Sequence, residues 1–379
     1  MSNKLFRFAG VSTRAGVTKA RFSDRASYVA ALQKVGDSNI DLVELKFPMN
    51  KVDAVKYLVS IDFANGNAEV NRVLKEFLDK RENIADVVYT EFISSEGLIR
   101  NAQKSVIKLD IFEKERPVGI QIFGANLDSM LQSIDIVESV KPDIIDINFG
   151  CPVKKVVSKG AGAGILKDID LMVKLTREMC KRTKLPVTIK TRLGWDENSI
   201  KIVEVAERLQ DVGAKAISIH GRTRAQMYKG DADWTKIAEI KNNPRMHIPV
   251  FGNGDVNSPE KAKEMRDEYG LDGAMIGRAS IGNPWFFNQV KHYLQTGKKI
   301  EEPSIAERAE MAIRHVKMAL EWKGDVLGVL ETRRHYGTYF KGIANFKETK
   351  SRILTENDPA TILQELDRVK KSFFEKELA

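Results

Sequence analysis

The feature that most constrains the fold of this 379-residue chain is a regular alternation between residues 84 and 280. Short runs rich in β-branched residues alternate there with longer stretches, such as SIDIVESVK and KIVEVAERLQDVGA, whose apolar residues recur at helical spacing. This alternation is typical of βα units around a parallel sheet. The seven runs are ADVVYT (85–90), VGIQIFG (118–124), IIDINFG (144–150), PVTIKTR (186–192), AISIHGR (216–222), PVFGNGD (249–255) and GAMIGR (273–278).

The closed architecture nearest to seven such units is an α/β fold, the eight-stranded (β/α) or TIM barrel, so one further strand is expected upstream. Two segments could supply it, LFRFAGVS (5–12) and IDLVELKFPM (40–49). Residues 1–84 are longer than one strand and one helix require, so the sequence leaves open whether they provide that strand or form a small extra domain. We predict an atypical N-terminal segment over residues 1–84 and a barrel over residues 85–300.

Beyond residue 300 the βα alternation stops and a helical pattern takes its place. The stretches SIAERAEMAIRHVKMALEWK, GVLETRRHYGTYFKGI and DPATILQELDRVKKSFFEKE all have apolar residues at helical spacing and are rich in Arg and Lys. They predict a C-terminal helical domain over residues 301–379, packed as a bundle against the barrel.

Composition excludes several classes of protein. No apolar run reaches the roughly 18 residues that cross a bilayer, and the start MSNKLFRFAG lacks the apolar core of a signal peptide, so we expect a cytoplasmic protein without a membrane partner. The only two cysteines, Cys151 and Cys180, show no ligand spacing, which argues against a metal site or a disulfide. The net charge of +9 makes RNA or DNA a candidate partner, on weak evidence. We expect a monomer.

Polar side chains end four successive runs of the predicted barrel. Active sites of such barrels lie at the carboxyl ends of the strands. Exposure to water would explain one polar strand end, but four in succession predict a catalytic face. These residues are Asn148 with Cys151, Lys190 with Arg192, His220 with Arg222, and Asn253 with Asp255.

The last two runs carry glycines where many barrels bind phosphate. In GNGD (252–255) and IGR (276–278), glycine would let backbone N–H groups approach an anion, and Arg278 could pair with it. These residues predict a phosphate-bearing cofactor or substrate. Lys190 would be an unpaired buried charge unless it faced an anion, and the negatively charged ring of a reduced flavin is one candidate.

Several motifs together resemble the dihydrouridine synthase family, FMN-dependent enzymes that reduce specific uridines in tRNA. They are DINFGCPVKKVVSKGAGAGIL, VTIKTRLGWD, ISIHGRTRAQMYKGDADW, GNGD and MIGRA, and the match runs from about Ala85 to about Leu354. The resemblance implies a (β/α) barrel followed by a helical tRNA-binding domain, with NADPH or NADH as reductant. It implies that Cys151 is the catalytic proton donor. The implied FMN contacts are Gln121, Lys190, His220, Asn253, Gly254, Asp255, Gly277 and Arg278.

Reduction of the C5=C6 bond of uracil explains why a lone cysteine would be needed. One carbon receives a hydride from the flavin, and the other receives a proton from an acid on the opposite face of the base. A thiol with a pKa of about 8.5 still carries its proton near neutral pH, so Cys151 suits this role. The expected substrate contacts are Asn148, Lys154, Arg222 and Arg224 around the barrel, and Arg333, Arg334 and Lys341 in the helical domain.

The N-terminal segment departs from the family pattern, which opens with an Ala-Pro-Met turn and then Gly-Val-Thr-Asp. FAGVSTRAGVTKARF (8–22) keeps AGVT without the Pro-Met, and FPM (47–49) keeps Pro-Met without AGVT. Two alternative functions follow, a non-catalytic RNA-binding relative and an FMN barrel oxidoreductase that acts on a free pyrimidine. The retained Cys151, Lys190, His220 and GNGD argue against the first alternative, and the basic helical tail argues against the second.

Overall fold

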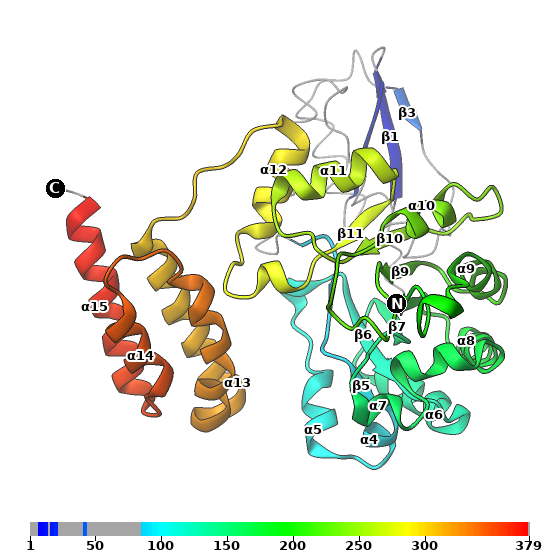
Figure 1. Ribbon diagram of the computed structural model, residues 1–379, viewed down its shortest axis with the longest axis horizontal. Coiled ribbons are helices and arrows are strands. Elements are labelled where there is room, and N and C mark those ends of the chain that lie inside the picture. Colours follow the sequence, from blue (N-terminus) through cyan, green and yellow to red (C-terminus); the bar gives the residue numbers. More distant parts are fainter. Residues whose placement is uncertain (1–6, 14–15, 22–40, 44–84, 378–379) are drawn as a thin grey trace. The chain divides into compact units, whose positions relative to one another are not determined.

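The structure is a computed structural model that describes residues 7–13, 16–21, 41–43 and 85–377 (Figure 1). The chain divides into two compact units, the first comprising Met1–Val256 with Lys261–Met275 and the second Asn257–Glu260 with Ile276–Ala379. The predicted boundary at residue 300 lies inside the second unit, which also contains the IGR segment.

The first unit is built on a parallel sheet whose described strands follow the order β11-β10-β9-β8-β7-β6-β4, with β5 also paired to β6. Each of the seven predicted runs contains one of these strands, and neighbours in the sheet are successive in the chain. This is the arrangement of a (β/α) barrel, as predicted. The strands are β4 (Val88–Tyr89), β5 (Ile93–Ser94), β6 (Val118–Phe123), β7 (Ile144–Asn148), β8 (Val187–Arg192), β9 (Ile217–His220), β10 (Val250–Asn253) and β11 (Gly273–Met275).

Helices connect the strands, and short polar side chains cap the start of two of the longer ones. The Asn126 side chain accepts a hydrogen bond from the Ser129 N–H at the start of α6, and Asp168 caps α8 in the same way through the Leu171 N–H. Apolar strand residues such as Ile120 and Ile145 are fully buried. The helices are α4 (Ser95–Ile99), α5 (Gln103–Val106), α6 (Leu127–Ser139), α7 (Lys154–Val157), α8 (Ile169–Arg182), α9 (Ile202–Asp211), α10 (Thr235–Lys241) and α11 (Pro259–Tyr269).

The described N-terminal strands form a separate antiparallel sheet. Strand β1 (Arg7–Thr13) pairs with both β2 (Gly16–Arg21) and β3 (Asp41–Val43). The two segments considered for the first barrel strand overlap β1 and β3, which pair with each other and not with the described barrel strands. The other residues of those segments lie outside the described part of the chain, so the origin of a further barrel strand stays a prediction.

The second unit is helical, as predicted, and comprises α12 (Phe286–Thr296), α13 (Ile305–Tyr339), α14 (Lys347–Thr355) and α15 (Pro359–Glu377). Gly324 interrupts α13 with φ 73° and ψ 175°, so this element consists of two helical arms. The arms lie side by side, since a Cβ on Gly328 would come within 2.8 Å of the Ala319 carbonyl oxygen. In the described residues no helix is long and apolar enough to cross a membrane.

Candidate active site

Cys151 lies in the loop that follows β7, at the carboxyl end of the sheet, and is only 6% exposed. Its N–H donates to Asn148 Oδ1 at 2.9 Å, and the Gly150 N–H donates to the same oxygen at 3.0 Å. Its carbonyl accepts a hydrogen bond from the Ala163 N–H at 2.9 Å. Gly162 has φ +55°, and a Cβ there would lie 2.9 Å from the Cys151 oxygen, so the close approach requires glycine. The cysteine is therefore held by its backbone from both sides.

A chain of buried side-chain hydrogen bonds leads from Asn148 into the barrel. Asn148 Nδ2 donates to Gln121 Oε1, and Gln121 Nε2 donates to Asp146 Oδ2, each at 2.6 Å. Thr188 Oγ1 donates to Asp146 Oδ1 at 2.5 Å. The sheet register places Asp146 opposite both Gln121 and Thr188. The structure thus brings together the predicted residues Gln121, Asn148 and Cys151.

Asp146 is the member of this chain that the sequence analysis missed. It lies in the strand IIDIN, in which all five residues are buried. A carboxylate in such a strand needs polar partners, because burying an unpaired charge is very unfavourable. The sequence signal that could have identified Asp146 was an acidic residue inside a strand that is otherwise mostly apolar.

Lys190, on β8, pairs in register with Asn148 on β7. Within the described residues its Nζ makes no hydrogen bond or ion pair. Burial, followed by the charge of Arg192, lowers the pKa of Lys190 to about 8, against the opposing charge of Asp146. An anionic group beside this amine would stabilise its charged form.

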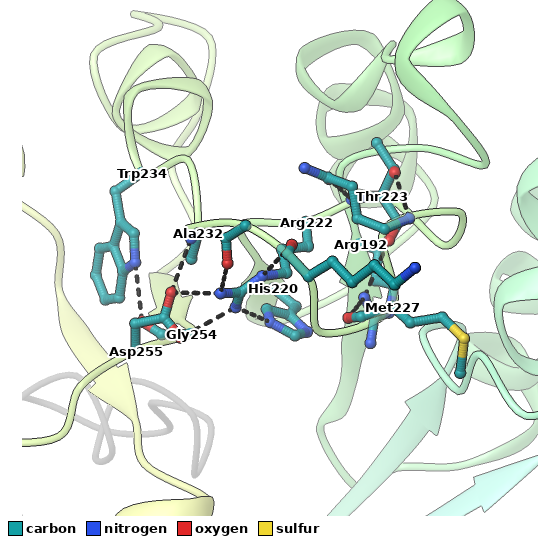
Figure 2. Close-up of polar contacts among 12 residues, drawn as sticks. Arg192, His220, Arg222, Thr223, Met227, Ala232, Trp234, Gly254 and Asp255 are labelled. Carbon is teal, nitrogen blue, oxygen red and sulfur yellow. Dashed lines mark hydrogen bonds and ion pairs between the residues drawn. The ribbon is translucent and has the colours of Figure 1, made fainter.

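Arg192 joins the cysteine loop to the loop after β9. Its Nε donates to the Gly150 carbonyl at 2.8 Å, and its Nη1 donates to the carbonyls of Thr223 and Met227 at 3.0 and 2.9 Å (Figure 2). Burial raises the pKa of Cys151, while a backbone hydrogen bond from Val153 and the charge of Arg192 act against this. Burial has the larger effect, so the thiol keeps its proton at neutral pH.

The buried His220 and Arg222 form a polar cluster with the half-buried Asp255 (Figure 2). Arg222 binds the Asp255 carboxylate through two hydrogen bonds, at 2.6 and 3.1 Å, and its Nη1 lies 3.2 Å from His220 Nε2. Burial, followed by the charges of Arg192, Lys190 and Arg222, lowers the pKa of His220 to about 2. The imidazole is therefore neutral. Since the guanidinium can only donate, His220 Nε2 is the acceptor and Nδ1 carries the hydrogen.

Arg222, which the sequence analysis places among the substrate contacts, is the centre of this cluster. The residue is 2% exposed, and its guanidinium also donates to the carbonyls of Lys229 and Gly230. The donors of Arg222 are thus directed inward to Asp255, His220 and these carbonyls, and its contact with a substrate stays a prediction.

The GNGD turn is held by contacts on both sides of β10. Asn253 Nδ2 donates to the Met275 carbonyl on β11 at 2.7 Å, and Trp234 Nε1 donates to the Gly254 carbonyl at 3.1 Å. Gly254 has φ +119°, and a Cβ there would lie 2.6 Å from that of Ala232. Asn253, Gly254 and Asp255 thus lie in the same unit as His220. Gly277 and Arg278 are exposed and belong to the second unit, so their part in cofactor binding stays a prediction.

Lys154 and Lys167 flank the cysteine loop in sequence and are exposed, whereas Arg224, in the loop after β9, is half-buried. Lys154 starts the short helix α7, immediately after the loop, and is exposed. Arg224 lies over the ring of Trp195 at 4.6 Å, and Lys167 lies over the same ring at 3.9 Å. The Arg224 Nε is buried and makes no hydrogen bond within the described residues. Lys154 and Arg224 therefore remain candidates for contact with a polyanion.

The three basic residues expected in the helical domain differ in their surroundings. Arg333 Nη2 donates to the Glu356 carbonyl at 2.6 Å and to Asn357 Oδ1 at 2.7 Å, which ties α13 to the segment before α15. Arg334 and Lys341 are exposed, and Arg334 Nε donates to His335 Nε2 at 3.2 Å. Arg333 therefore has a structural role in this unit, while Arg334 and Lys341 present charge at its surface.

Comparison with known proteins shows the family. The model of the dihydrouridine synthase (Dus) family matches residues 68–374. A probable tRNA-dihydrouridine synthase of Rickettsia conorii is 35% identical over 299 residues, which cover 79% of this chain and 88% of that protein. The tRNA-dihydrouridine synthase B of Pseudomonas putida is 36% identical over 268 residues, covering 71% of this chain and 79% of that protein. Among solved structures, a mandelate oxidase aligns with a TM-score of 0.35 and 16% identity over 55% of this chain and 61% of its own. The chain belongs to the dihydrouridine synthase family.

Proposed function

We propose that the protein reduces the C5=C6 bond of specific uridines in tRNA to 5,6-dihydrouridine, with FMN as cofactor and NADPH or NADH as reductant. The observation that carries the proposal is a buried, protonated cysteine at the carboxyl end of a barrel sheet in a chain of this family. Cys151 has a raised pKa and a loop held by hydrogen bonds to Asn148 and Ala163.

The residues at this end of the sheet fit FMN by the chemistry of their donors. Lys190, Arg192 and Arg222 bring positive charge to the carboxyl ends of β8 and β9, while His220 is neutral. Such a set suits a cofactor with a phosphate and a ring that becomes anionic on reduction. Lys190, which has no ion pair within the described residues, would face the ring, and Gln121, His220, Asn253, Gly254 and Asp255 would complete the site. Bound FMN would supply the hydride.

Cys151 supplies the proton to the other carbon of the base. Burial raises the pKa of the Cys151 thiol and so favours its neutral form, which keeps the proton available at neutral pH. The hydrogen bonds from the Cys151 and Gly150 N–H groups to Asn148 Oδ1 fix the position of the loop and hence of the sulfur. After transfer the nearby Arg192 charge stabilises the thiolate.

A uridine must leave its stack to reach a side chain at the end of a barrel, so the protein would hold the surrounding RNA by its backbone. The exposed charges of Lys154, Arg334 and Lys341 and the Arg224 side chain support such contacts. The buried Arg222 and the half-buried Arg333 would act by positioning other groups.

The test separates the two half-reactions at Cys151. Cys151→Ala should bind FMN, shown by its visible spectrum, and should be reduced by NADPH as the parent is, because neither step uses the thiol. Reoxidation by unmodified tRNA in a single turnover should fall by about 10²- to 10⁴-fold, the usual worth of a general acid. Cys180→Ala is the matched control and should behave as the parent.

Two results would contradict the proposal. If Cys151→Ala forms dihydrouridine at the parental rate, another group supplies the proton. If the parent protein stays colourless after FMN is added and still binds tRNA, the chain is a non-catalytic RNA-binding relative.

A further inference from the structure

The buried carboxylate of Asp146 has no part in the proton transfer described above. Asp146 is 1% exposed, and both its oxygens accept hydrogen bonds, one from Thr188 and one from Gln121. Burial raises its pKa to about 7, while the hydrogen bonds from Thr188 and Gln121 and the charge of Lys190 act in the opposite direction. An apolar side chain would satisfy this buried strand position without that penalty. The carboxylate therefore calls for an explanation beyond packing.

The directions of the hydrogen bonds explain why a carboxylate occupies this buried position. When ionised, the Asp146 carboxylate can only accept, and when protonated it can place its proton on Oδ1 toward the Thr188 hydroxyl while Oδ2 still accepts. In both forms Gln121 turns its Nε2 toward Asp146, which leaves its Oε1 for Asn148. Asn148 must then turn its Nδ2 toward Gln121, which leaves its Oδ1 for the backbone of the cysteine loop.

The far end of the chain imposes the same orientation. The N–H groups of Gly150 and Cys151 can only donate, at 3.0 and 2.9 Å from Asn148 Oδ1. With an acceptor at one end and two donors at the other, one arrangement of the two amides satisfies every partner. A flip of either amide would oppose donor to donor and acceptor to acceptor inside the barrel, where unsatisfied polar groups are costly.

We propose that Asp146 is a positioning residue, which sets the orientation of the Gln121 and Asn148 amides and thereby holds the backbone of the Cys151 loop. The relay (Asp146, Gln121, Asn148) acts on the loop whether or not flavin is bound. The role of this relay in catalysis rests on the proposed function of Cys151, whereas its effect on the loop does not depend on that function.

The test measures how often the loop opens, as the rate at which iodoacetamide alkylates Cys151 in the full-length protein without added cofactor. Peptide mapping by mass spectrometry separates Cys151 from Cys180. Because Cys180 lies on α8 of the same unit, its rate reports general loosening. Asp146→Leu removes the acceptor at similar volume, and should speed alkylation of Cys151 by about 10- to 100-fold, since a buried polar group left unsatisfied costs about 1–3 kcal/mol.

Asp146→Asn is the rescue variant. Its side-chain oxygen can still accept from Gln121 while its NH₂ group donates to the Thr188 hydroxyl, so the Cys151 rate should stay within about threefold of the parent. A third variant, Gln121→Met, cuts the relay one step later and should match Asp146→Leu. Because the two changes break the same relay, the double variant should be no faster than either single one.

Parental alkylation of Cys151 in Asp146→Leu would overturn the proposal. So would effects of Asp146→Leu and Gln121→Met that multiply in the double variant, or a Cys180 rate that rises in parallel with the Cys151 rate. If Asp146→Leu does not fold, as judged by circular dichroism, Asp146→Ala takes its place with the same expectations. A parent protein that protects Cys151 but forms no dihydrouridine would leave the relay in place and remove only the proposed function.

Discussion

At the level of single residues, burial and neighbouring charges together set the pKa of the titratable side chains at the carboxyl end of the sheet. Their balance differs from one side chain to the next. Reactive cysteines have a lowered pKa because a cation or a helix N-terminus stabilises the thiolate. Here burial outweighs the charge of Arg192, and the pKa of Cys151 rises. At His220 burial and three cations act together, so the imidazole stays neutral. The first outcome suits an acid, and the second keeps one more positive charge out of a crowded cationic site.

The raised pKa of Asp146 should give a measurable pH dependence of stability. Because that pKa is about 7 in the folded protein, the folded state between about pH 4 and 7 holds a proton that the unfolded chain has released. This contribution therefore falls as the pH rises through the window. Asp146→Asn lacks it, so relative to the parent its stability should increase with pH by up to about 1.4 kcal/mol per unit, measured from denaturant midpoints. An equal pH dependence in the two proteins would contradict this.

His220 provides the control of opposite sign. Its lowered pKa means that, below about pH 6.5, the unfolded chain takes up a proton that the folded protein does not. That contribution to stability is present at neutral pH and is lost as the pH falls. His220→Gln should therefore gain stability relative to the parent on acidification, whereas Asp146→Asn should lose it.

At the level of elements, the segment between β7 and α8 depends on a close approach at Gly162. With φ +55° there, a Cβ would lie 2.9 Å from both the Cys151 oxygen and Val156 Cγ1. At Gly160, with φ +73°, the nearest atom is Ala125 Cβ at 3.7 Å. The two glycines share a left-handed backbone and differ in the space around them.

This pair separates backbone strain from crowding. Gly160→Ala should lower the free energy of unfolding by about 1–2 kcal/mol, through the strain of a left-handed non-glycine residue alone. Gly162→Ala should lower it further, because the backbone of the cysteine loop must move, and it should also speed alkylation of Cys151. If both variants lose the same free energy of unfolding and protect Cys151 equally from alkylation, the loop accommodates the added Cβ without strain.

At the level of the whole molecule, the net charge of +9 is carried by two units with distinct cores. In the helical unit the core contains Ala309, Val316, Tyr336, Ile362 and Leu366, which come from α13 and α15. Arg333 on α13 donates hydrogen bonds to the segment between α14 and α15, whereas Arg334 and Lys341 remain at the surface. Basic residues that are close in sequence therefore serve different purposes.

Substitution of Arg333 should affect the stability of the helical unit, whereas substitution of Arg334 or Lys341 should affect RNA binding. Arg334→Ala and Lys341→Ala should each weaken tRNA binding and reduce the slope of log affinity against log salt by about one, with the melting temperature unchanged. Arg333→Ala should lower the melting temperature of the helical unit, because it leaves the Glu356 carbonyl and Asn357 without their partner, and should keep the parental salt slope. A reduced slope for Arg333→Ala alone would place the RNA contact at Arg333 instead.

The amino-acid sequence by itself determined the elements of this protein, because periodicity is a local property. The β-branched runs became the parallel strands, the helical tail became α13 to α15, and the motif around Cys151 indicated the family. Tertiary structure decided which polar side chains are partners. Asp146 meets Gln121 and Thr188, which are 25 and 42 positions away, and Arg222 meets Asp255, 33 positions away. Such partners follow from strand register and burial, which depend on the whole sheet, so the inward roles of Asp146, Arg222 and Arg333 emerged only from the folded chain.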